Sequence, residues 1–443
     1  MDQIRKVLNQ MITRRIEQLV CRTLLAAFAC ASAVFVTPAN SAPDDRVLQL
    51  ARAEKEPLLA TLKELVAIES GSGDREGLDR ISALIHARLT ALGGKVEFVE
   101  PGPDTYRMHD TPKEVGRMVR ARFEGTGTKK ILLIAHMDTV YLRGMGAQQP
   151  FRIDGNRAYG LGISDDKGGV AVILHVMTML RAMNFNDYAH ITVLINGDEE
   201  ISSPASRTLL TKLGGEHDAV LSFEATRANS DQLSLATAGI AAVTFKVKGK
   251  ASHAGSSPEN GRNALYELAH QMLQTKDFSD PAIGVKMNWT VARAGTNRNV
   301  IPADAEAAAD VRVLRVSDYD GIETKVRERI RNKLIPDTTV DMTFERRRPP
   351  LEASAAARAL AKHAQGIYSE LGKNLLVLDT AEGGGTDAAF ASLKTSAPVI
   401  ERFGLMGFGA HSNDAEYIFI DSIEPRLYLA TRLIVDIAQG KAR

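Results

Sequence analysis

The apolar positions of this 443-residue chain recur with two periods, one typical of helices and the other of strands. Residues 44–69 and 78–92 carry apolar side chains at helical spacing, which predicts an amphipathic helix over each segment. Residues 95–99 and 116–123 alternate between apolar and polar side chains, which predicts two strands with one buried face. These elements lead into residues 131–140, ILLIAHMDTV, where four consecutive apolar residues predict a strand buried on both faces.

Helices and strands continue to alternate after this central strand. We predict a largely buried helix over residues 165–183, in which His175 is a packed core residue rather than a ligand. Two further buried strands are predicted over residues 191–196 and 219–223. Strands that alternate with helices in this way indicate a sheet sandwiched between helices, and therefore an α/β fold.

The pattern changes near residue 238. From there the predicted order is strand, helix, strand, strand, helix, strand, over residues 240–248, 263–275, 286–294, 307–314, 319–334 and 340–344. This is the order of the split β-α-β, or ferredoxin-like, α+β unit. Residues 354–371 return to the helical pattern. We therefore predict an inserted domain over residues 238–347, between two parts of one catalytic domain at 42–237 and 348–443.

Residues 1–41 have the organisation of a secretory signal peptide. Basic residues, Arg14 and Arg15 among them, precede an apolar run over residues 23–36, and small residues follow it. The apolar run is too short to span a bilayer comfortably. We predict cleavage after Ser41 and export of the mature protein to the periplasm, with no membrane attachment after cleavage. An uncleaved membrane anchor is the alternative interpretation.

The composition bears on the class of binding partner and on the residues that could bind a metal ion. Lys+Arg number 55 and Asp+Glu 54, and this balance gives no support for a nucleic-acid or membrane-surface partner. Both cysteines, Cys21 and Cys30, lie within the predicted signal peptide. The mature chain would therefore form no disulfides and offer no thiolate ligands, so a metal site must use histidine, aspartate and glutamate.

Histidines and carboxylates gather where predicted strands end and in nearby loops. The five clusters are His136 with Asp138, Asp165 with Asp166, Asp198 with Glu199 and Glu200, Glu224, and His411. Each alone would fit a solvated loop or a helix cap, but together they supply the nitrogen and oxygen ligands that Zn²⁺ accepts. So many carboxylates allow two metal ions about 3.5–4 Å apart, with one carboxylate bridging them. One glutamate would then remain as a general base, a division that the adjacent pair Glu199 and Glu200 suits.

Eight motifs in order along the chain resemble those of the M20 metallopeptidases, and among these the bacterial glutamate carboxypeptidases. They are HMDTV, GISDDKGG, GDEE, SFE, GKASHAG, NVIPADAEAAADVR, GGGTDAA and GFGAHS. The resemblance extends from about residue 50 to the C-terminus. It implies a zinc-exopeptidase-like catalytic domain, with a mixed sheet between helices, and an inserted ferredoxin-like domain that serves as a dimerisation or lid domain.

The resemblance also implies the metal ligands. His136 and Glu224 are expected to be terminal ligands of one zinc ion. Glu200 and His411 are expected to complete the second site, and Asp165 to bridge both ions, so that each subunit holds two Zn²⁺. All five positions are intact, which argues against an inactive relative.

Catalytic roles follow from the same resemblance. Glu199 is expected to be the general base, and Asp138 the carboxylate that orients the histidine of its own motif. The peptide bond between residues 165 and 166 is expected to be cis. His253 is expected to reach the active site of a partner subunit and to stabilise the oxyanion, which implies a homodimer formed through residues 238–347.

The substrate contacts are likewise implied by the resemblance. Asn299 and Arg312 are expected to hold the terminal carboxylate, a task that suits arginine because its guanidinium binds carboxylates bidentately. Arg348 is a further candidate. Gly384, inside the glycine run, would let the substrate approach backbone N–H groups.

These inferences predict an exported di-zinc carboxypeptidase that hydrolyses the amide bond to a C-terminal glutamate. Its substrates would be N-acyl or peptidyl compounds such as folates. One alternative is an M20 aminoacylase or dipeptidase with another side-chain preference. A second alternative, from a different functional class, is a non-catalytic exported protein that binds acyl amino acids.

Overall fold

The computed structural model, which describes residues 42–228, 230–412 and 415–442, places the predicted central strand in the middle of a mixed sheet. The six strands follow in the order β1-β2-β6-β3-β7-β17, and β3 is parallel to both of its neighbours. Their bounds are β1 (Lys95–Val99), β2 (Met118–Glu124), β3 (Lys130–His136), β6 (His190–Asn196), β7 (Ala219–Ser222) and β17 (Val399–Ile400). The predicted signal peptide and both cysteines lie outside the described residues.

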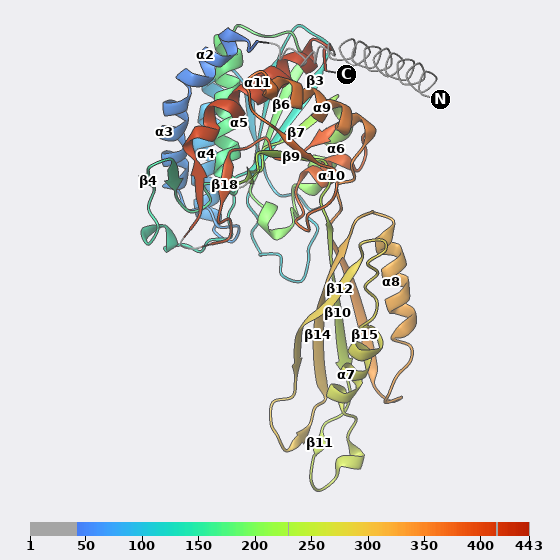
Figure 1. Cartoon of the computed structure of the whole chain (residues 1–443). Coiled ribbons are helices and arrows are strands. Elements are labelled where there is room, and N and C mark those ends of the chain that lie inside the picture. Colours follow the sequence, from blue (N-terminus) through green and yellow to red (C-terminus); the bar gives the residue numbers. More distant parts are fainter. Residues whose placement is uncertain (1–41, 229, 413–414, 443) are drawn as a thin grey trace, which may run out of the picture. The chain divides into compact units, whose positions relative to one another are not determined.

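Helices cover both faces of this sheet, as the sequence predicts (Figure 1). Ile131 and Leu133 of β3 join a large core with one set of helices, whereas Leu132 and Ile134 join a smaller core on the other face. The large core contains α2 (Asp45–Ala53), α3 (Lys55–Val66), α4 (Arg75–Ala91), α5 (Lys167–Ala182), α9 (Ala355–Ser369) and α11 (Ile423–Ala438). The smaller core contains α6 (Arg207–Glu216) and α10 (Ala388–Ser392). Among the described residues, none of the helices combines the length and the apolar character that crossing a membrane requires.

The helix predicted over residues 44–69 is in fact two helices, α2 and α3. Pro57, in the first turn of α3, has no backbone N–H and cannot bond to the carbonyl of Ala53, so the helix is interrupted at Glu54. The start of α2 is fixed by Asp44, whose side chain accepts a hydrogen bond from the backbone N–H of Val47 at 3.1 Å. The helical periodicity of residues 44–69 therefore predicts helix correctly, but it does not show the interruption at Glu54.

A second, antiparallel sheet has the element order predicted for the insert. Its strands follow in the order β12-β14-β10-β15, and they pack with two helices around a hydrophobic core of their own (Figure 1). The bounds are β10 (Gly239–Lys248), α7 (Ala264–Gln274), β12 (Lys286–Ala294), β14 (Asp304–Val313), α8 (Asp318–Arg329) and β15 (Thr339–Arg348). A short pair, β11 (Ser252–His253) and β13 (Val300–Ile301), precedes α7 and β14. The domain boundaries at residues 238 and 347 stay a prediction.

The periodic pattern gave no sign of the smaller sheets. A five-stranded sheet joins segments far apart in the chain: β4 (Arg152–Asp154), β5 (Arg157–Tyr159), β19 (Tyr417–Phe419), β18 (Met406–Phe408) and β8 (Thr226–Arg227), in that order. Another pairs β9 (Gln232–Ser234) with β16 (Leu376–Leu378). Strands of two or three residues are too short to display a period. The five-stranded sheet matters for the site because the loop with His411 connects β18 to β19.

His217 makes the stability of this fold depend on pH. Its side chain is buried, and its Nδ1 lies 2.7 Å from the carbonyl oxygen of Leu213, which can only accept, so Nδ1 carries the proton. Nε2 then accepts from the Thr192 hydroxyl at 2.8 Å, and the ring is neutral. Burial, together with a smaller effect of neighbouring His190, lowers the pKa of His217 to about 4.

We therefore expect acid to destabilise the protein through His217. The unfolded chain takes up this proton near pH 6.5, whereas the folded chain resists it until about pH 4. The contribution is fully present above pH 6.5 and is lost as the pH falls to 4, on the order of 3 kcal/mol in total. Urea unfolding of the wild type and of His217→Gln across this range should show a shallower pH dependence for the variant. His270→Gln, at a half-buried position, is the control, and equal slopes for wild type and His217→Gln would contradict the prediction.

Candidate metal centre

Three parallel strands end at one edge of the central sheet and bring the predicted residues together. β3 ends at His136, and Glu224 follows two residues after the end of the neighbouring β7. On the other side of β3, the end of β6 leads into a short 3-10 helix over Glu199–Ile201. The carboxyl ends of adjacent parallel strands are where open α/β sheets place their sites.

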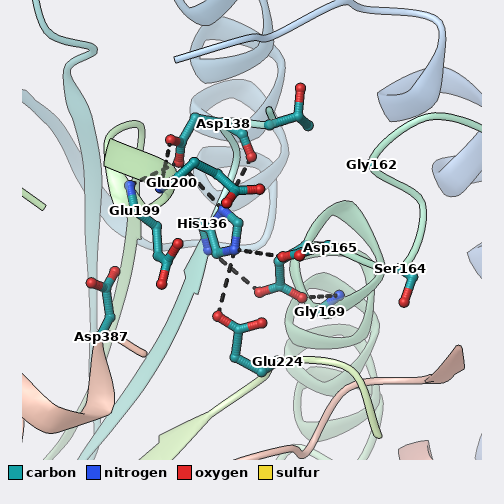
Figure 2. A network of polar contacts seen from close by, with 12 residues as sticks. His136, Asp138, Gly162, Ser164, Asp165, Gly169, Glu199, Glu200, Glu224 and Asp387 are labelled. Carbon is teal, nitrogen blue, oxygen red and sulfur yellow. Dashed lines mark hydrogen bonds and ion pairs between the residues drawn. The ribbon is translucent and has the colours of Figure 1, made fainter. Parts of the chain in front are cut away.

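Two groups of ligand atoms meet at Asp165. Nε2 of His136 lies 3.1 Å from Oδ1 of Asp165 and 3.5 Å from Oε1 of Glu224 (Figure 2). Nε2 of His411 lies 3.3 Å from Oδ2 of Asp165 and 3.2 Å from Oε2 of Glu200. Asp165 thus offers one oxygen to each group, which is the arrangement that a bridging carboxylate requires.

The donor set fits divalent metal ions. Imidazole nitrogens and carboxylate oxygens, here in two groups of three, are ligands that Zn²⁺ accepts. Oε1 of Glu200 is buried and has no hydrogen-bond partner among the described residues, although a buried carboxylate oxygen without a partner is costly. A cation at this position would satisfy it. The residues present therefore fit a metal pair.

Burial and neighbouring charges shift the pKa values of several residues in the site. Burial raises the pKa of Glu200 to about 7. Hydrogen bonds that the His411 ring donates to the carboxylates of Asp165 and Glu200 raise the pKa of His411 to about 11. Burial opposes a charge on His136, but Glu224 and the two aspartates beside the ring outweigh burial and raise its pKa. The buried carboxylates thus need positive charge nearby, which bound metal ions would supply with the imidazoles deprotonated.

The two aspartates of the Asp165–Asp166 pair have different contacts. The peptide bond between them is cis, as expected. Oδ1 of Asp166 accepts from the backbone N–H of Gly169 at 3.1 Å and caps α5, and Oδ2 accepts from the backbone N–H of His136 at 3.4 Å. Asp166 also lies within ligand distance of His136 and Glu224, so position alone does not distinguish it from Asp165 as a ligand of that group.

Asp138 fixes the positions of several site residues at once. It is fully buried, and its Oδ1 lies 3.3 Å from Nδ1 of His136. The same carboxylate accepts from the backbone N–H groups of Glu199 at 3.0 Å and Glu200 at 3.1 Å, and from the Ser72 hydroxyl at 2.7 Å. The orienting role predicted for Asp138 is therefore compatible with its contacts, which reach the turn of Glu199 and Glu200 as well as the histidine.

Glu199 lies beside the ligand groups and is paired with an arginine. Its carboxyl group points between Asp387 and the His136–Glu224 pair in Figure 2. Arg348 forms an ion pair with this carboxylate and donates to the backbone carbonyl of Glu199 at 2.5 Å. Burial raises the pKa of Glu199 well above its usual range, although Arg348 opposes the shift.

Arg348 was predicted as a substrate contact, and the structure places it on Glu199. It is only 4% exposed, and its guanidinium also lies 3.6 Å from Asp387. The neighbouring arginines turn to other carboxylates, Arg346 to Asp320 and Glu323, and Arg347 to Asp110.

The other predicted substrate contacts are Arg312 in β14 of the second sheet, Gly384 in the glycine run, and Asn299 directly before β13. Arg312 pairs with Asp310 at 2.8 Å and donates to the carbonyl of Gly383 at 2.9 Å. Gly384 follows directly, and a Cβ built on it meets no atom within 4 Å, so space beside its backbone is open. Asn299 is exposed, and its carbonyl oxygen accepts from the backbone N–H of Ala254 at 2.8 Å.

His253 is exposed, is the last residue of β11, and directly precedes Ala254 in the chain. Its Nδ1 accepts from the backbone N–H groups of Gly255 and Ser256, each at 3.1 Å, so Nε2 carries the proton. The hydrogen bonds described for its ring and backbone all go to residues of the insert. Within one chain, these contacts do not link His253 to the metal ligands.

Sequence reasoning missed Glu416 and Asp387. Glu416 is buried and accepts from the backbone N–H groups of Gly162 at 2.7 Å, Ser164 at 2.8 Å and Asp165 at 3.1 Å. It thereby holds the turn that carries Asp165. Asp387 accepts from Asn196 at 2.8 Å and lies beside Arg348. Only the GGGTDAA motif pointed toward Asp387, and nothing in the sequence pattern marked Glu416.

Comparison with known proteins gives a consistent result. The sequence model of Peptidase family M20/M25/M40 matches residues 132–436. Carboxypeptidase G2 from Pseudomonas sp. (strain RS-16) is 43% identical over 420 residues, which cover 95% of this chain and 99% of that relative.

Solved structures share the fold at low sequence identity. The M20 family metallo-carboxypeptidase Sso-CP2 from Sulfolobus solfataricus superposes with a TM-score of 0.67 at 17% identity, covering 86% of this chain and 99% of its own. The YXEP protein of Bacillus subtilis, described as a dinuclear metal binding peptidase of the M20 family, gives a TM-score of 0.62 at 15% identity, covering 88% and 99%. The predicted α/β fold with helices around a mixed sheet is thus confirmed.

Proposed function

Because the chain belongs to Peptidase family M20/M25/M40 and is a metallopeptidase, we propose that it releases C-terminal glutamate from N-acyl and peptidyl substrates, folates among them. The 43% identity to a carboxypeptidase, over an alignment that covers 95% of the chain, supports carboxypeptidase activity. The observation that carries the proposal is the pair of ligand groups joined by Asp165, with Glu199 beside them. The preference for glutamate follows from the resemblance of the motifs to those of glutamate carboxypeptidases.

Two Zn²⁺ ions per subunit are part of this proposal. His136, Asp165 and Glu224 would hold one ion, and Asp165, Glu200 and His411 the other. Bound zinc supplies Lewis-acid chemistry, which polarises the scissile carbonyl and lowers the pKa of the attacking water. Asp138 would keep the His136 ring in its ligand orientation through the contact at Nδ1.

Glu199 would act as the general base and then as the general acid of the reaction. Its carboxylate takes a proton from the attacking water and returns it to the nitrogen of the leaving amino acid. Arg348 forms an ion pair with the carboxylate of Glu199 and a hydrogen bond with its backbone carbonyl, so it holds the general base in one position. Burial of this pair keeps bulk water away from the proton that is transferred.

The remaining assignments concern substrate, partner and location. Arg312 and Asn299 would hold the α-carboxylate of the leaving amino acid, with Gly384 beside it. His253 of a second copy would stabilise the oxyanion, in a homodimer formed through residues 238–347. We further propose cleavage after residue 41, export to the periplasm, and the division into 42–237, 238–347 and 348–443.

Glutamate release from folate tests the function directly. Zinc-loaded protein comprising residues 42–443 is expected to release glutamate, and a chelator should abolish the release until zinc is restored. Release that survives removal of all bound metal would contradict the mechanism. No release from protein with confirmed zinc would contradict the glutamate assignment. The search would then turn to N-acetyl amino acids and dipeptides, the substrates of the aminoacylase or dipeptidase alternative.

A further inference from the structure

A cavity of about 600 Å³ lies between helices α6 and α10 on one side and residues of the insert on the other. Helix α6 forms one wall and residues 390–394 a second, while Val316, Tyr319 and Arg346 contribute the third. None of the metal ligands and none of the residues proposed for substrate contact line this cavity. It is therefore distinct from the candidate metal centre.

The ionisable side chains of the lining are mainly basic. Four basic residues line the cavity, and no carboxylate of the described residues does; the four are Arg207, Lys212, Arg346 and Lys394. Arg346 is compensated by ion pairs with Asp320 and Glu323. Lys212 and Lys394 are exposed, and neither forms an ion pair with any residue that the structure describes. An anion in the cavity would therefore meet positive charge that no carboxylate of the lining neutralises.

Arg207 is the most enclosed of these cations, and it also has no carboxylate partner within the described part of the chain. Its Nη2 donates to the backbone carbonyls of Ser202 at 2.6 Å and Arg347 at 2.7 Å. Its guanidinium lies 4.8 Å from the centroid of the Phe390 ring. Burial lowers the pKa of Arg207 to about 10, an effect that an anion bound beside the guanidinium would oppose.

Much of the remaining lining is apolar. Phe390 and Tyr319 contribute aromatic rings, and Leu393 and Val316 line the cavity while 43% and 38% exposed. A single exposed aliphatic side chain is ordinary on a protein surface. Two of them in one cavity with aromatic side chains offer a surface that a flat ring would cover. The volume of about 600 Å³ is within the usual range for small-molecule sites.

We propose that this cavity is a second binding site, for a small aromatic carboxylate, and that its occupation lowers kcat. The ring would lie against Leu393, Val316 and Phe390, and the carboxylate would pair with the basic residues of α6 and with Lys394. The charge selects an anion, and the apolar walls favour a ring over a small inorganic anion such as phosphate. The binding site does not depend on the proposed function, whereas the effect on kcat rests on it.

Arg207 connects the cavity to the general base. Ser202 ends the short helix that begins at Glu199, and Arg347 directly precedes Arg348, the ion-pair partner of Glu199. One nitrogen of Arg207 thus holds both sides of this pair. A carboxylate binds a guanidinium more strongly than a neutral carbonyl does. A bound anion would therefore weaken the hydrogen bonds of Arg207 to these carbonyls and loosen the position of Glu199.

The binding test titrates the purified, zinc-loaded protein with 2-naphthoate and follows the fluorescence of the ligand. The wild type is expected to bind with a Kd below about 1 mM. Replacing both lysines, Lys212→Glu with Lys394→Glu, should weaken binding at least about tenfold. The neutral analogue 2-naphthalenemethanol should bind the wild type about tenfold more weakly than 2-naphthoate. Lys373→Glu, at an exposed lysine outside the cavity, is the matched control and should leave the Kd unchanged.

A second variant fills the cavity without changing its charge. Thr208 is exposed in α6 and lines the cavity, so Thr208→Trp would place an indole ring in this space. Binding of 2-naphthoate should become undetectable. If Thr208→Trp does not fold by circular dichroism, the double lysine variant decides alone. Equal Kd values for the wild type and the double lysine variant, or no binding to the wild type, would overturn the proposed site.

The kinetic test measures glutamate release with and without saturating 2-naphthoate. The ligand is expected to lower kcat of the wild type about fivefold or more and to change KM less than about twofold. At the same ligand concentration, the double lysine variant should show a smaller decrease. Bound ligand with unchanged kcat, or a rise in KM alone, would overturn the connection to Glu199. If no glutamate is released under any condition, the proposed function fails and the titration still decides the site.

Discussion

Replacing Glu199 by glutamine is expected to lower kcat for glutamate release by roughly 10²–10⁴-fold while zinc stays bound. Glutamine has the same shape, but its amide cannot take a proton from the attacking water. The five predicted ligands are untouched, so metal content should not change. The melting temperature should fall, because Arg348 is 4% exposed and would lose its charged partner in a buried pair.

Three measurements separate this role from a structural one. Zinc content is measured by elemental analysis, kcat and KM by glutamate release, and folding by circular dichroism. Glu267→Gln is a matched control, because Glu267 is also a fully buried glutamate but lies in α7 of the insert. It should keep kcat near the wild-type value. A Glu199→Gln enzyme with bound zinc and kcat within about tenfold of the wild type would remove Glu199 from the general-base role.

Long periodic segments carried most of the fold prediction. The apolar run of β3 and the mostly apolar helix α5 are buried as predicted, because burial on both faces requires apolar side chains throughout. The sequence could not show the five-stranded sheet, whose strands span two or three residues. It also did not lead us to α11, which is buried along nearly its whole length and so lacks the contrast between an apolar and a polar face.

The candidate ligands could be named from the sequence because each follows a predicted strand or lies in a recognisable motif. The supporting residues could not. Glu416 follows His411 by five positions in a loop, and nothing local distinguishes it from a solvated carboxylate. Its importance comes from three backbone N–H groups about 250 residues earlier in the chain. Arg348 was named from the sequence as a candidate substrate contact, but its contact with Glu199, which spans 149 residues, could not be inferred from the local sequence.

Without the family resemblance, the sequence does not show which member of the Asp165–Asp166 pair is a metal ligand. From the structure we expect different effects when each aspartate is replaced by asparagine. Asp165→Asn is expected to lose most of the bound zinc and to lower kcat by at least 10²-fold. Asp165 directs Oδ1 to His136 and Oδ2 to His411, and asparagine would keep one neutral oxygen and place an amide N–H₂ at the other position. Both ligand groups are therefore affected by one substitution.

Asp166→Asn is the matched variant and is expected to keep the zinc. The contacts of Asp166 are to the backbone N–H groups of Gly169 and His136, and an asparagine oxygen can accept from the first of these as a helix N-cap. The expected cost is therefore in stability, about 1 kcal/mol or less, with kcat reduced much less than in Asp165→Asn. Zinc analysis of the two purified variants, with thermal melts, measures both effects. Loss of zinc from Asp166→Asn alone would transfer the ligand role to Asp166, which also lies within ligand distance of His136 and Glu224.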